Sequence, residues 1–454
     1  MALETLSPAT GKSVKIFPTW GQTELEAALS QVAAATLNWQ ATCYTDRSAL
    51  MKKAAAQLRA EADRYAGIIT LEMGKLKKEA LGEIEKCAWV CDYYADNAEQ
   101  FLADEVIESD AQRSLVAYQP IGTVLAVMPW NFPFWQVFRF AAPGLMAGNT
   151  GVLKHASNVP QCALAIEEVF HKAGFPAGVF RSLMIAAPQV QGVIEDSRIH
   201  AVTLTGSEPA GRKVAAAAGA CLKKSLLELG GSDAFIVLHD ADLELAATQG
   251  VVSRFMNAGQ SCIAAKRFIV VEAIAEDFMA LFKQKVDALV PGDPDDEATT
   301  LAPMARDDLR DELHRQVVDS VAAGAIVVSG CEPVEGQGSF YQPSILDRVA
   351  PGMRAYDEEL FGPVAIMIRA KDEEDALAIA NSSRFGLGGS IWTQDRQRGE
   401  ALARCLQAGA CFVNGMVKSD PRLPFGGTKA SGYGRELSVL GIKEFVNAKT
   451  IWIG

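Results

Sequence analysis

The sequence predicts an α/β protein whose strands form doubly wound parallel sheets. Three observations support this fold class. Residues 22–104 carry apolar residues at the three- and four-residue spacing of helices, in alanine-rich, charge-patterned runs. From residue 122 onward, strand-like and helix-like segments alternate, as they do in βαβ units. A second set of the same kind begins at Ala234–Leu238.

The composition is that of a globular protein with room for two or three domains, since the chain has 454 residues, 49% of them hydrophobic. A net charge of −12 with scattered Lys and Arg argues against nucleic acid or an anionic membrane as partner. Neither a signal peptide nor an apolar membrane span is recognisable. Nine widely spread cysteines favour a cytoplasmic location over a disulfide framework. Because the five histidines are isolated, we expect no metal site.

The N-terminal helices are expected over residues 24–35, 46–62, 64–73 and 75–98, and they are interpreted as scaffold. A β-rich segment follows, which predicts an extended arm and then the buried strand Gly122–Met128. The run PWNFPFW, residues 129–135, predicts a tight turn that carries one amide, Asn131. This turn is either a packed aromatic corner or an active-site wall whose amide aims at a carbonyl oxygen.

The next strands are expected over 148–154, 179–185, 200–205 and 224–229, with helices over 160–173, 189–196 and 212–220. Gly206 and Ser207 lie where a strand meets a helix, so free backbone N–H groups there could bind a phosphate. The alternative is a plain helix N-cap. A P-loop is excluded because Arg212-Lys213 follows the second glycine, and the common G-x-G-x-x-G fingerprint is absent.

The carboxylate of Glu228 ends a predicted strand and is followed by two glycines. Ligands of α/β sheets bind at that end of the strands. In the second set, strands are expected over 234–238, 268–271, 325–329, 364–369, 389–392 and 411–414, and helices over 275–290, 307–323, 371–381 and 398–408. The glycine-dense run 424–436 predicts a loop of defined conformation, and residues 443–453 predict a final strand.

A single cysteine, Cys262, lies in the small, polar run FMNAGQSCIAAKR of residues 255–267. Its neighbours leave room for a small electrophile. Lys266 and Arg267 follow, and positive charge is expected to favour the thiolate. The alternative is an inert cysteine that acts as a small core hydrophobe.

Six motifs occur in the order and approximate spacing of one known family: PWNFP, LTGS, ELGG, NAGQSC, EELFGPV and PFGGTKASGYGRE. The chain thus resembles the aldehyde dehydrogenase superfamily over nearly its whole length. The resemblance implies a Rossmann-type NAD(P)-binding domain over 1–101 and 121–230, and an α/β catalytic domain over 231–435. It also implies a β oligomerisation arm over 102–120 and 436–454, and hence a homodimer or a dimer of dimers.

The same resemblance implies a role for each motif residue. Cys262 would attack the aldehyde as thiolate, Asn131 and the Cys262 N–H would hold the oxyanion, and Glu228 would activate water to release the acid. Cofactor-binding positions would be Trp130, Lys154, Ser157, Gly206, Ser207, Glu359 and Phe361. Many NAD-preferring members have glutamate where this chain has Ser157. Because serine does not repel a 2′-phosphate, we expect NADP to be accepted, alone or beside NAD.

The substrate is suggested by a closer resemblance to bacterial succinate-semialdehyde dehydrogenases. Arg139 and Ser419 match positions that bind the far carboxylate there, while Trp135 and Phe425 would line the aldehyde tunnel. The alternative for Arg139 is a surface or interdomain ion pair.

One departure from that pattern keeps other substrates open. A second arginine is expected where this chain has Met256, so Arg254, Lys418 or Arg422 would have to compensate. Otherwise the substrate is a different aldehyde, such as glutarate semialdehyde or an apolar or aromatic aldehyde. A non-catalytic binding protein is disfavoured by the intact Cys262, Glu228 and Asn131, and a CoA-acylating enzyme by Glu228, because a deacylating water needs a base.

Overall fold

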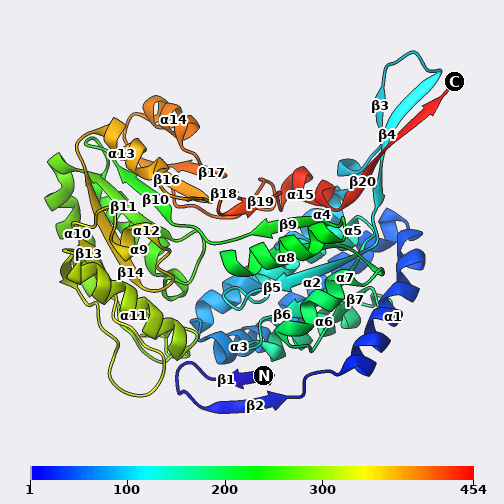
Figure 1. The fold of residues 1–454 in the computed structure, drawn as a ribbon, viewed down its shortest axis with the longest axis horizontal. Coiled ribbons are helices and arrows are strands. Elements are labelled where there is room, and N and C mark those ends of the chain that lie inside the picture. The colour runs from blue at the N-terminus through cyan, green and yellow to red at the C-terminus, as the bar shows by residue number, and fades with distance from the viewer. Residues whose placement is uncertain (1–2) are drawn as a thin grey trace.

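The computed structural model describes residues 3–454 and contains two α/β units and a projecting β arm (Figure 1). The predicted fold class is confirmed. A six-stranded sheet in the order β19-β9-β8-β5-β6-β7 organises the first unit. All neighbours from β9 to β7 pair in parallel. Its parallel strands are β5 (Thr123–Met128), β6 (Thr150–His155), β7 (Phe180–Ser182), β8 (Ile199–Thr205) and β9 (Lys224–Glu228).

Helices cover both faces of this sheet. The predicted N-terminal helices are confirmed as α1 (Gln22–Gln40), α2 (Tyr44–Ala60), α3 (Ala62–Met73) and α4 (Lys77–Phe101), and later ones as α6 (Pro160–Lys172), α7 (Val190–Glu195) and α8 (Glu208–Ala220). An unpredicted hairpin of β1 (Leu3–Leu6) and β2 (Ser13–Phe17) begins the described chain. Strand β7 is shorter than the predicted 179–185.

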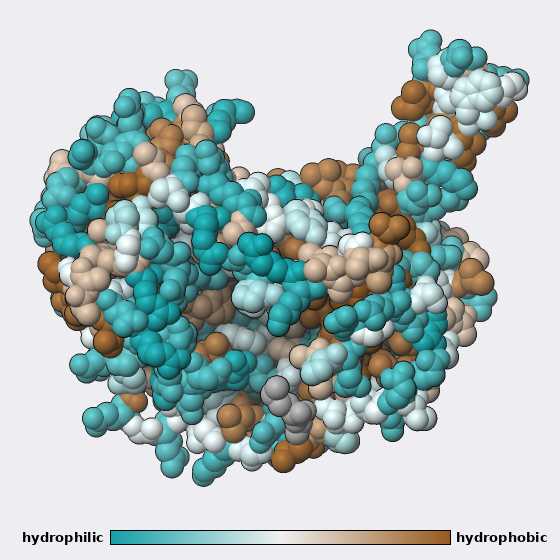
Figure 2. All heavy atoms as spheres, viewed as in Figure 1, coloured by the Kyte–Doolittle hydropathy of each residue, from teal (hydrophilic) through white to brown (hydrophobic). Residues whose placement is uncertain are grey.

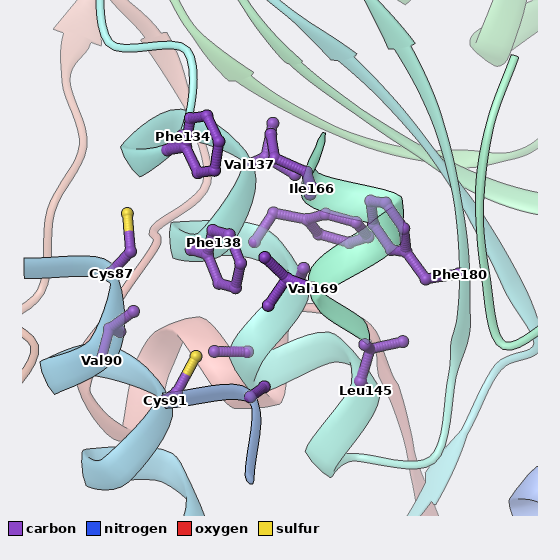
Figure 3. Packing of buried hydrophobic residues seen from close by; sticks show 14 of the residues in the cluster. Cys87, Val90, Cys91, Phe134, Val137, Phe138, Leu145, Ile166, Val169 and Phe180 are labelled. Atoms are coloured by element: carbon purple, nitrogen blue, oxygen red, sulfur yellow. The ribbon is translucent and has the colours of Figure 1, made fainter. Parts of the chain in front are cut away.

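Helix α5 (Trp135–Met146) directly follows the aromatic turn, and the sequence reading missed it. All twelve of its residues are buried, and it contains Pro143, a residue that is normally excluded from helix interiors. Its side chains pack against α4 and α6 in one core, where Phe138 lies between Cys91 of α4 and Val169 of α6 (Figure 3). Phe138 also stacks on Phe170, with 5.2 Å between the ring centroids. The rigid core fixes α5, which carries Trp135 and Arg139.

The second unit is built on a seven-stranded sheet in the order β12-β13-β14-β11-β10-β16-β17, parallel except between β12 and β13. Its strands are β10 (Asp233–Val237), β11 (Ala265–Val271), β12 (Ile326–Ser329), β13 (Ser344–Asp347), β14 (Val364–Ala370), β16 (Gly388–Trp392) and β17 (Ala410–Val413). Its helices are α9 (Leu243–Phe255), α10 (Ala275–Asp287), α11 (Asp307–Ala322), α12 (Arg354–Asp357), α13 (Glu373–Asn381) and α14 (Arg396–Cys405). Of these, α9, β13 and α12 were not predicted.

The arm is an antiparallel sheet of β20 (Val446–Ile453), β4 (Arg113–Pro120) and β3 (Glu105–Ile107) that stands clear of the body (Figures 1 and 2). The predicted last strand starts later than expected, because α15 (Ser438–Glu444) precedes it. Short strands β15 (Phe385–Gly386), β18 (Thr428–Lys429) and β19 (Gly432–Tyr433) anchor the glycine-dense loop, and β19 pairs with β9 beside Glu228.

Each helix within residues 3–454 is too short or too polar to cross a membrane. The same residues hold no group of three His, Cys, Asp or Glu side chains placed to bind a metal ion.

Candidate active site

The first cavity lies at the point where the strand order of the six-stranded sheet reverses. From β5 the chain adds β6 and β7 on one side, and then β8 and β9 on the other. The chain segments that leave the carboxyl ends of β5 and β8 therefore run in opposite directions, and open α/β sheets bind ligands in the crevice between such segments. A cavity of about 260 Å³, the switch-point cavity, is lined there by Trp130, Asn131, Gly206 and Ser207, and also by Cys262.

Helix α8 begins at Glu208, four residues earlier than predicted. Ser207 is its N-cap residue, in extended conformation, and Pro209 occupies the first turn, where its missing N–H costs nothing. Gly211 is thus inside the helix and not part of a phosphate loop. The remaining free N–H groups at this helix end face the cavity edge, which suits an anionic group.

The second cavity, the α4–α5 cavity, has a volume of about 290 Å³. It lies between α4, α5 and the segments 256–263 and 416–425. Four predicted substrate residues, Trp135, Arg139, Ser419 and Phe425, line it together. Cys262 lines both cavities, so one sulfur faces a site at the sheet edge and a second, largely apolar site.

The segment before Cys262 has an unusual backbone conformation, which hydrogen bonds to other segments hold in place. Asn257, Ala258 and Gly259 all have left-handed φ values, of 56°, 51° and 71°. This conformation is energetically unfavourable for residues other than glycine, and such strained residues are typical of functional sites. The Asn257 N–H donates to both Glu79 carboxylate oxygens at 3.2 and 3.3 Å, and its amide donates to the Asn131 and Gln260 carbonyls. The loop is therefore fixed in the shape that presents Cys262.

Burial opposes the thiolate form of Cys262 that the neighbouring cations were expected to favour. Enclosure by protein raises the pKa of the thiol to about 12, more than Arg139 and Lys266 lower it. Lys266 points its ammonium at the Ser261 and Cys262 carbonyl oxygens, at 2.8 and 2.9 Å, and pairs with Glu359. Arg267 donates to backbone carbonyls on the other side, including Ser232 at 2.8 Å. Neither cation is aimed at the sulfur.

The amide of Asn131 lies next to this loop and is buried. Its Nδ2 donates one hydrogen to the Gln260 carbonyl at 3.0 Å, which leaves the second hydrogen free. The backbone carbonyl of Asn131 in turn accepts from Asn257 at 2.9 Å. The aromatic turn and the cysteine loop thus hold each other in place, as expected of an active-site wall.

Glu228 lies at the end of β9, fully buried, and lines neither cavity. Neither of its carboxylate oxygens has a hydrogen-bond partner within residues 3–454. Burial raises the pKa of Glu228 well above its usual range, and the nearby Glu436 raises it further, while Arg139 lowers it. Burial therefore favours the protonated form of Glu228, and its carboxylate is a strong base once it ionises.

The two glycines after Glu228 are required by close approaches. A methyl group on Gly231 would lie 2.7 Å from the Cys262 carbonyl oxygen, and one on Gly230 would overlap Glu359. Glu359 accepts from the Gly231 N–H at 3.1 Å. The linker between the two sheets therefore brings Glu359 and Cys262 together across the switch-point cavity.

The predicted cofactor residues are brought together only in part. Trp130, Gly206, Ser207, Glu359 and Phe361 line the switch-point cavity, and the Trp130 and Phe361 rings meet edge to face at 5.8 Å. Lys154 lies in β6, the strand next to β5, and Ser157 follows that strand; neither residue lines this cavity. The ammonium of Lys154 is buried, and no carboxylate of residues 3–454 lies within ion-pair distance of it.

Arg139 forms a buried ion pair with Glu436, and its guanidinium stacks over the Phe425 ring at 4.4 Å. This is the ion pair named as the alternative to a substrate role, although it is buried and not at the surface. Two proposed substitutes for the missing arginine do not reach the cavity. Arg254 donates to the Leu360 and Gly362 carbonyls, and Arg422 pairs with Asp420. Of the three, only Lys418 lines the α4–α5 cavity, from an exposed position.

Several charged residues of the α4–α5 cavity, among them Lys86 and Glu83, were not singled out from the sequence. Lys86 and Glu83 come from α4, which was interpreted as scaffold. Glu83 accepts from the N–H groups of Phe134 and Trp135 at 2.9 and 3.0 Å, which fixes the start of α5, and it pairs with Lys75. Two charged residues three apart on an otherwise amphipathic helix, both toward the buried face, are the one sequence signal available.

A nucleophile between a switch-point cavity and an apolar cavity defines an α/β enzyme that acts on a small electrophile. The model of the aldehyde dehydrogenase family matches residues 1–451, and the chain belongs to this family.

The chain is 51% identical to a probable succinate-semialdehyde dehydrogenase [NADP(+)] of Synechocystis sp., and the match covers 100% of both chains. It is 49% identical to a succinate-semialdehyde dehydrogenase [NADP(+)] of Mycobacterium avium, over 100% of this chain and 97% of the relative. Among solved structures, the chain is similar to the succinic semialdehyde dehydrogenase from Streptococcus pyogenes in complex with NADP+. The two sequences are 40% identical, and the structures superpose with a TM-score of 0.98 over all of both chains.

Proposed function

We propose that this aldehyde dehydrogenase oxidises succinate semialdehyde to succinate with NADP+ as the acceptor. One observation carries the proposal: Cys262 lines both the switch-point cavity and the α4–α5 cavity, and the walls of the latter are mostly apolar but include the cations Lys86, Arg139 and Lys418. The two carboxylates in its lining have partners, since Glu79 accepts from the Asn257 N–H and Glu83 pairs with Lys75. An ω-carboxy aldehyde matches that lining. The relatives named for this substrate and for NADP+ support it.

The residues at the switch-point cavity fit a nicotinamide dinucleotide. The open end of α8 at Ser207 suits the pyrophosphate, Glu359 a ribose, and the buried, unpaired ammonium of Lys154 the adenosine side. Ser157 places no carboxylate near a 2′-phosphate, which supports NADP+, with NAD+ as a second acceptor. When bound, the nicotinamide supplies a hydride acceptor, which the side chains of this protein lack.

The chain's own residues divide the remaining work. After loss of its proton, the Cys262 sulfur attacks the aldehyde carbon, and the free Asn131 Nδ2 hydrogen and the Cys262 N–H stabilise the oxygen. Once the adduct is oxidised to a thioester, ionised Glu228 takes a proton from water, and that water releases the acid. Because Glu228 lines neither cavity, its carboxylate has to turn toward Cys262 for this step.

A second candidate substrate is a different aldehyde, such as glutarate semialdehyde or an apolar or aromatic one. Met256 favours it, because this thioether lines the α4–α5 cavity where a second arginine was expected. The experiment that separates the candidates measures kcat/KM for succinate semialdehyde and butanal, each with NADP+ and NAD+. A strong preference for the semialdehyde supports the proposal, and equal values remove the substrate assignment.

We further propose the domain division given above, with 1–101 and 121–230 binding the cofactor, 231–435 carrying the cysteine, and 102–120 with 436–454 forming an oligomerisation arm. The arm exposes apolar residues and an open strand edge, which supports a homodimer or dimer of dimers. The cytoplasm remains the proposed location, supported by nine free cysteines.

A further inference from the structure

The ammonium of Lys266 contacts the peptide bond that joins Ser261 to the nucleophile. Lys266 is 1% exposed, and its Nζ donates to the Ser261 and Cys262 carbonyl oxygens at 2.8 and 2.9 Å. Its remaining contact is the ion pair with Glu359, at 3.2 Å. An ammonium has three N–H donors, so these three acceptors use all of them. Lys266 therefore has no donor left for a ligand, and its charge acts on this peptide and on Glu359.

The peptide itself faces the site, whereas the lysine lies behind it. Ser261 and Cys262 both line the α4–α5 cavity, and Lys266 lines neither cavity. The peptide is trans, so its carbonyl and its N–H point in opposite directions. Because Lys266 holds the Ser261 carbonyl, the Cys262 N–H points away from Lys266. Among residues 3–454 no backbone carbonyl accepts from this N–H, which leaves it free for the oxygen of a substrate.

A cation at a carbonyl oxygen also changes the other end of the same peptide. Linked hydrogen bonds polarise one another, so donation to the oxygen strengthens donation by the N–H. The effect is larger for a charged donor and where water is excluded. The Ser261 carbonyl already accepts the Ala264 N–H at 3.2 Å and so has a partner without the lysine. The ammonium therefore adds polarisation to a carbonyl that is not in need of a donor.

A neighbouring cation has the purely structural role against which Lys266 can be compared. Arg267 is buried as well, and its guanidinium donates to the carbonyls of Ser232, Ile379 and Ala380. None of these three residues lines either cavity, and none belongs to the peptide before the nucleophile. Arg267 thus joins β11 to α13 and to the residue before β10, without a contact to the proposed oxyanion donors.

We propose that Lys266 polarises the Ser261–Cys262 peptide and thereby strengthens the Cys262 N–H as a donor to the oxygen of the bound aldehyde. Lys266 is a positioning residue, because it acts through this peptide and touches neither the substrate nor the sulfur. Its effect is largest after the sulfur has attacked, when the aldehyde oxygen carries negative charge. This inference rests on the proposed function, because it requires that Cys262 attacks an aldehyde.

The test reads the strength of this hydrogen bond from the thioester that accumulates in a Glu228→Gln background. An isotopic label at the aldehyde carbon of succinate semialdehyde enters the thioester carbonyl, and isotope-edited infrared spectroscopy isolates its stretching band. A weaker donor moves this band to higher frequency. We expect Lys266→Met to shift the band upward and Lys266→Arg to keep it near its original position. The matched control, Arg267→Met, should leave the band unchanged although it removes a buried cation.

The rate of the first burst of reduced cofactor gives a second reading, which needs no substitution at Glu228. It is measured at saturating NADP+, so that a change in cofactor affinity through Glu359 has no influence. Loss of a whole oxyanion donor costs roughly a hundred- to a thousandfold in rate. Because Lys266→Met weakens the donor without removing it, we expect the burst to slow by about tenfold. Lys266→Gln keeps a neutral donor and should lie between Lys266→Met and the wild type in both readings.

Formation of the thioester shows that a variant is folded, and Lys266→Gln carries the test if Lys266→Met does not form it. An unshifted band in the variant that carries the test contradicts the inference, and so does an equal shift in Arg267→Met. In both cases the proposed function stands, because the thioester has formed. A wild type that gives no burst with succinate semialdehyde or butanal refutes the proposed function and the inference together.

Discussion

Single residues of the site differ from their solution behaviour because of burial. Cys262 and Glu228 both have raised pKa values, and in each the largest cause is the loss of water around the charged form. Burial therefore favours the thiol form of Cys262 and the carboxylic acid form of Glu228. Both become reactive only after a proton leaves, which limits side reactions of the cysteine when no substrate is bound.

We expect Cys262 to be alkylated slowly in the cofactor-free protein. At pH 7, iodoacetamide should modify it at least about tenfold more slowly than the exposed Cys43 and Cys405, because little thiolate is present. Peptide mass spectrometry over time measures all three in one sample. Labelling of Cys262 ahead of Cys43 and Cys405 at neutral pH would contradict a raised pKa.

Glu228 should make the protein less stable as pH rises. Its folded pKa is raised, so between about pH 4.3 and that pKa the folded state holds a proton that the unfolded state has lost. The free energy of unfolding then falls by up to about 1.4 kcal/mol per pH unit. Glu228→Gln should flatten this slope, as measured by urea unfolding from pH 5 to 9.

The control for this slope is Glu297→Gln, on the exposed acidic loop 291–300, which should follow the wild type. The same Glu228→Gln protein should retain a first burst of reduced cofactor and lose steady-state turnover, because only release of the acid needs the base. A variant with full turnover would show that another group activates the water.

At the scale of elements, the site depends on linkers that approach each other closely. The segment from β9 to β10 passes the cysteine loop with Gly231 against the Cys262 carbonyl oxygen, and the loop itself is held by Glu79 of α4. Helix α4 thus contributes Glu79, Glu83 and Lys86 to one wall of the site. Helix α4, whose sequence predicts only a scaffold role, therefore supplies charged groups that orient three other segments.

Gly231→Ala should lower kcat/KM by more than about tenfold, because the added methyl displaces the nucleophile, and a shift near 1 Å costs about a hundredfold. Gly219→Ala in α8 is the matched control. Its methyl meets nothing within 4 Å, so we expect unchanged activity and about 0.5–1 kcal/mol of added stability. Equal activity of both variants would show that the contact at Gly231 is unimportant.

At the scale of the whole molecule, the arm is a separate sheet that belongs to neither α/β unit. It projects from the body (Figure 2). Its strands expose apolar residues, among them Val106, Ile107, Trp452 and Ile453. A small sheet is stable by itself only when one of its faces is hydrophobic and packed. Pairing of its open edge with another subunit would cover these residues and add strand contacts.

We expect Val106→Glu, on the edge strand β3, to shift the protein toward smaller species in sedimentation velocity experiments. Val106 is 68% exposed in the single chain, and a carboxylate there opposes burial in an interface. Val318→Glu, on α11 of the other unit and 50% exposed, is the matched control and should sediment as the wild type does. An identical distribution for both variants would remove the arm from assembly.

The sequence predicts much of this architecture because local patterns carry it. Helical spacing identifies α1 to α4, and strand and helix alternation identifies the parallel sheets. It fails where local pattern and burial disagree. Helix α5 is buried on all sides and contains Pro143, which argues against a helix, and α8 starts early because Ser207 and Pro209 lie at its first turn, where a loop was expected.

The sequence by itself determined the family, the order of the motifs and the residue types at the centre of the site. Only the tertiary structure decided their charge states and partners. Arg139 meets Glu436, and Lys86 meets Ser419 333 positions later in the chain. A pKa or an ion pair depends on distances and on the exclusion of water, and these arise when segments far apart in the sequence pack together.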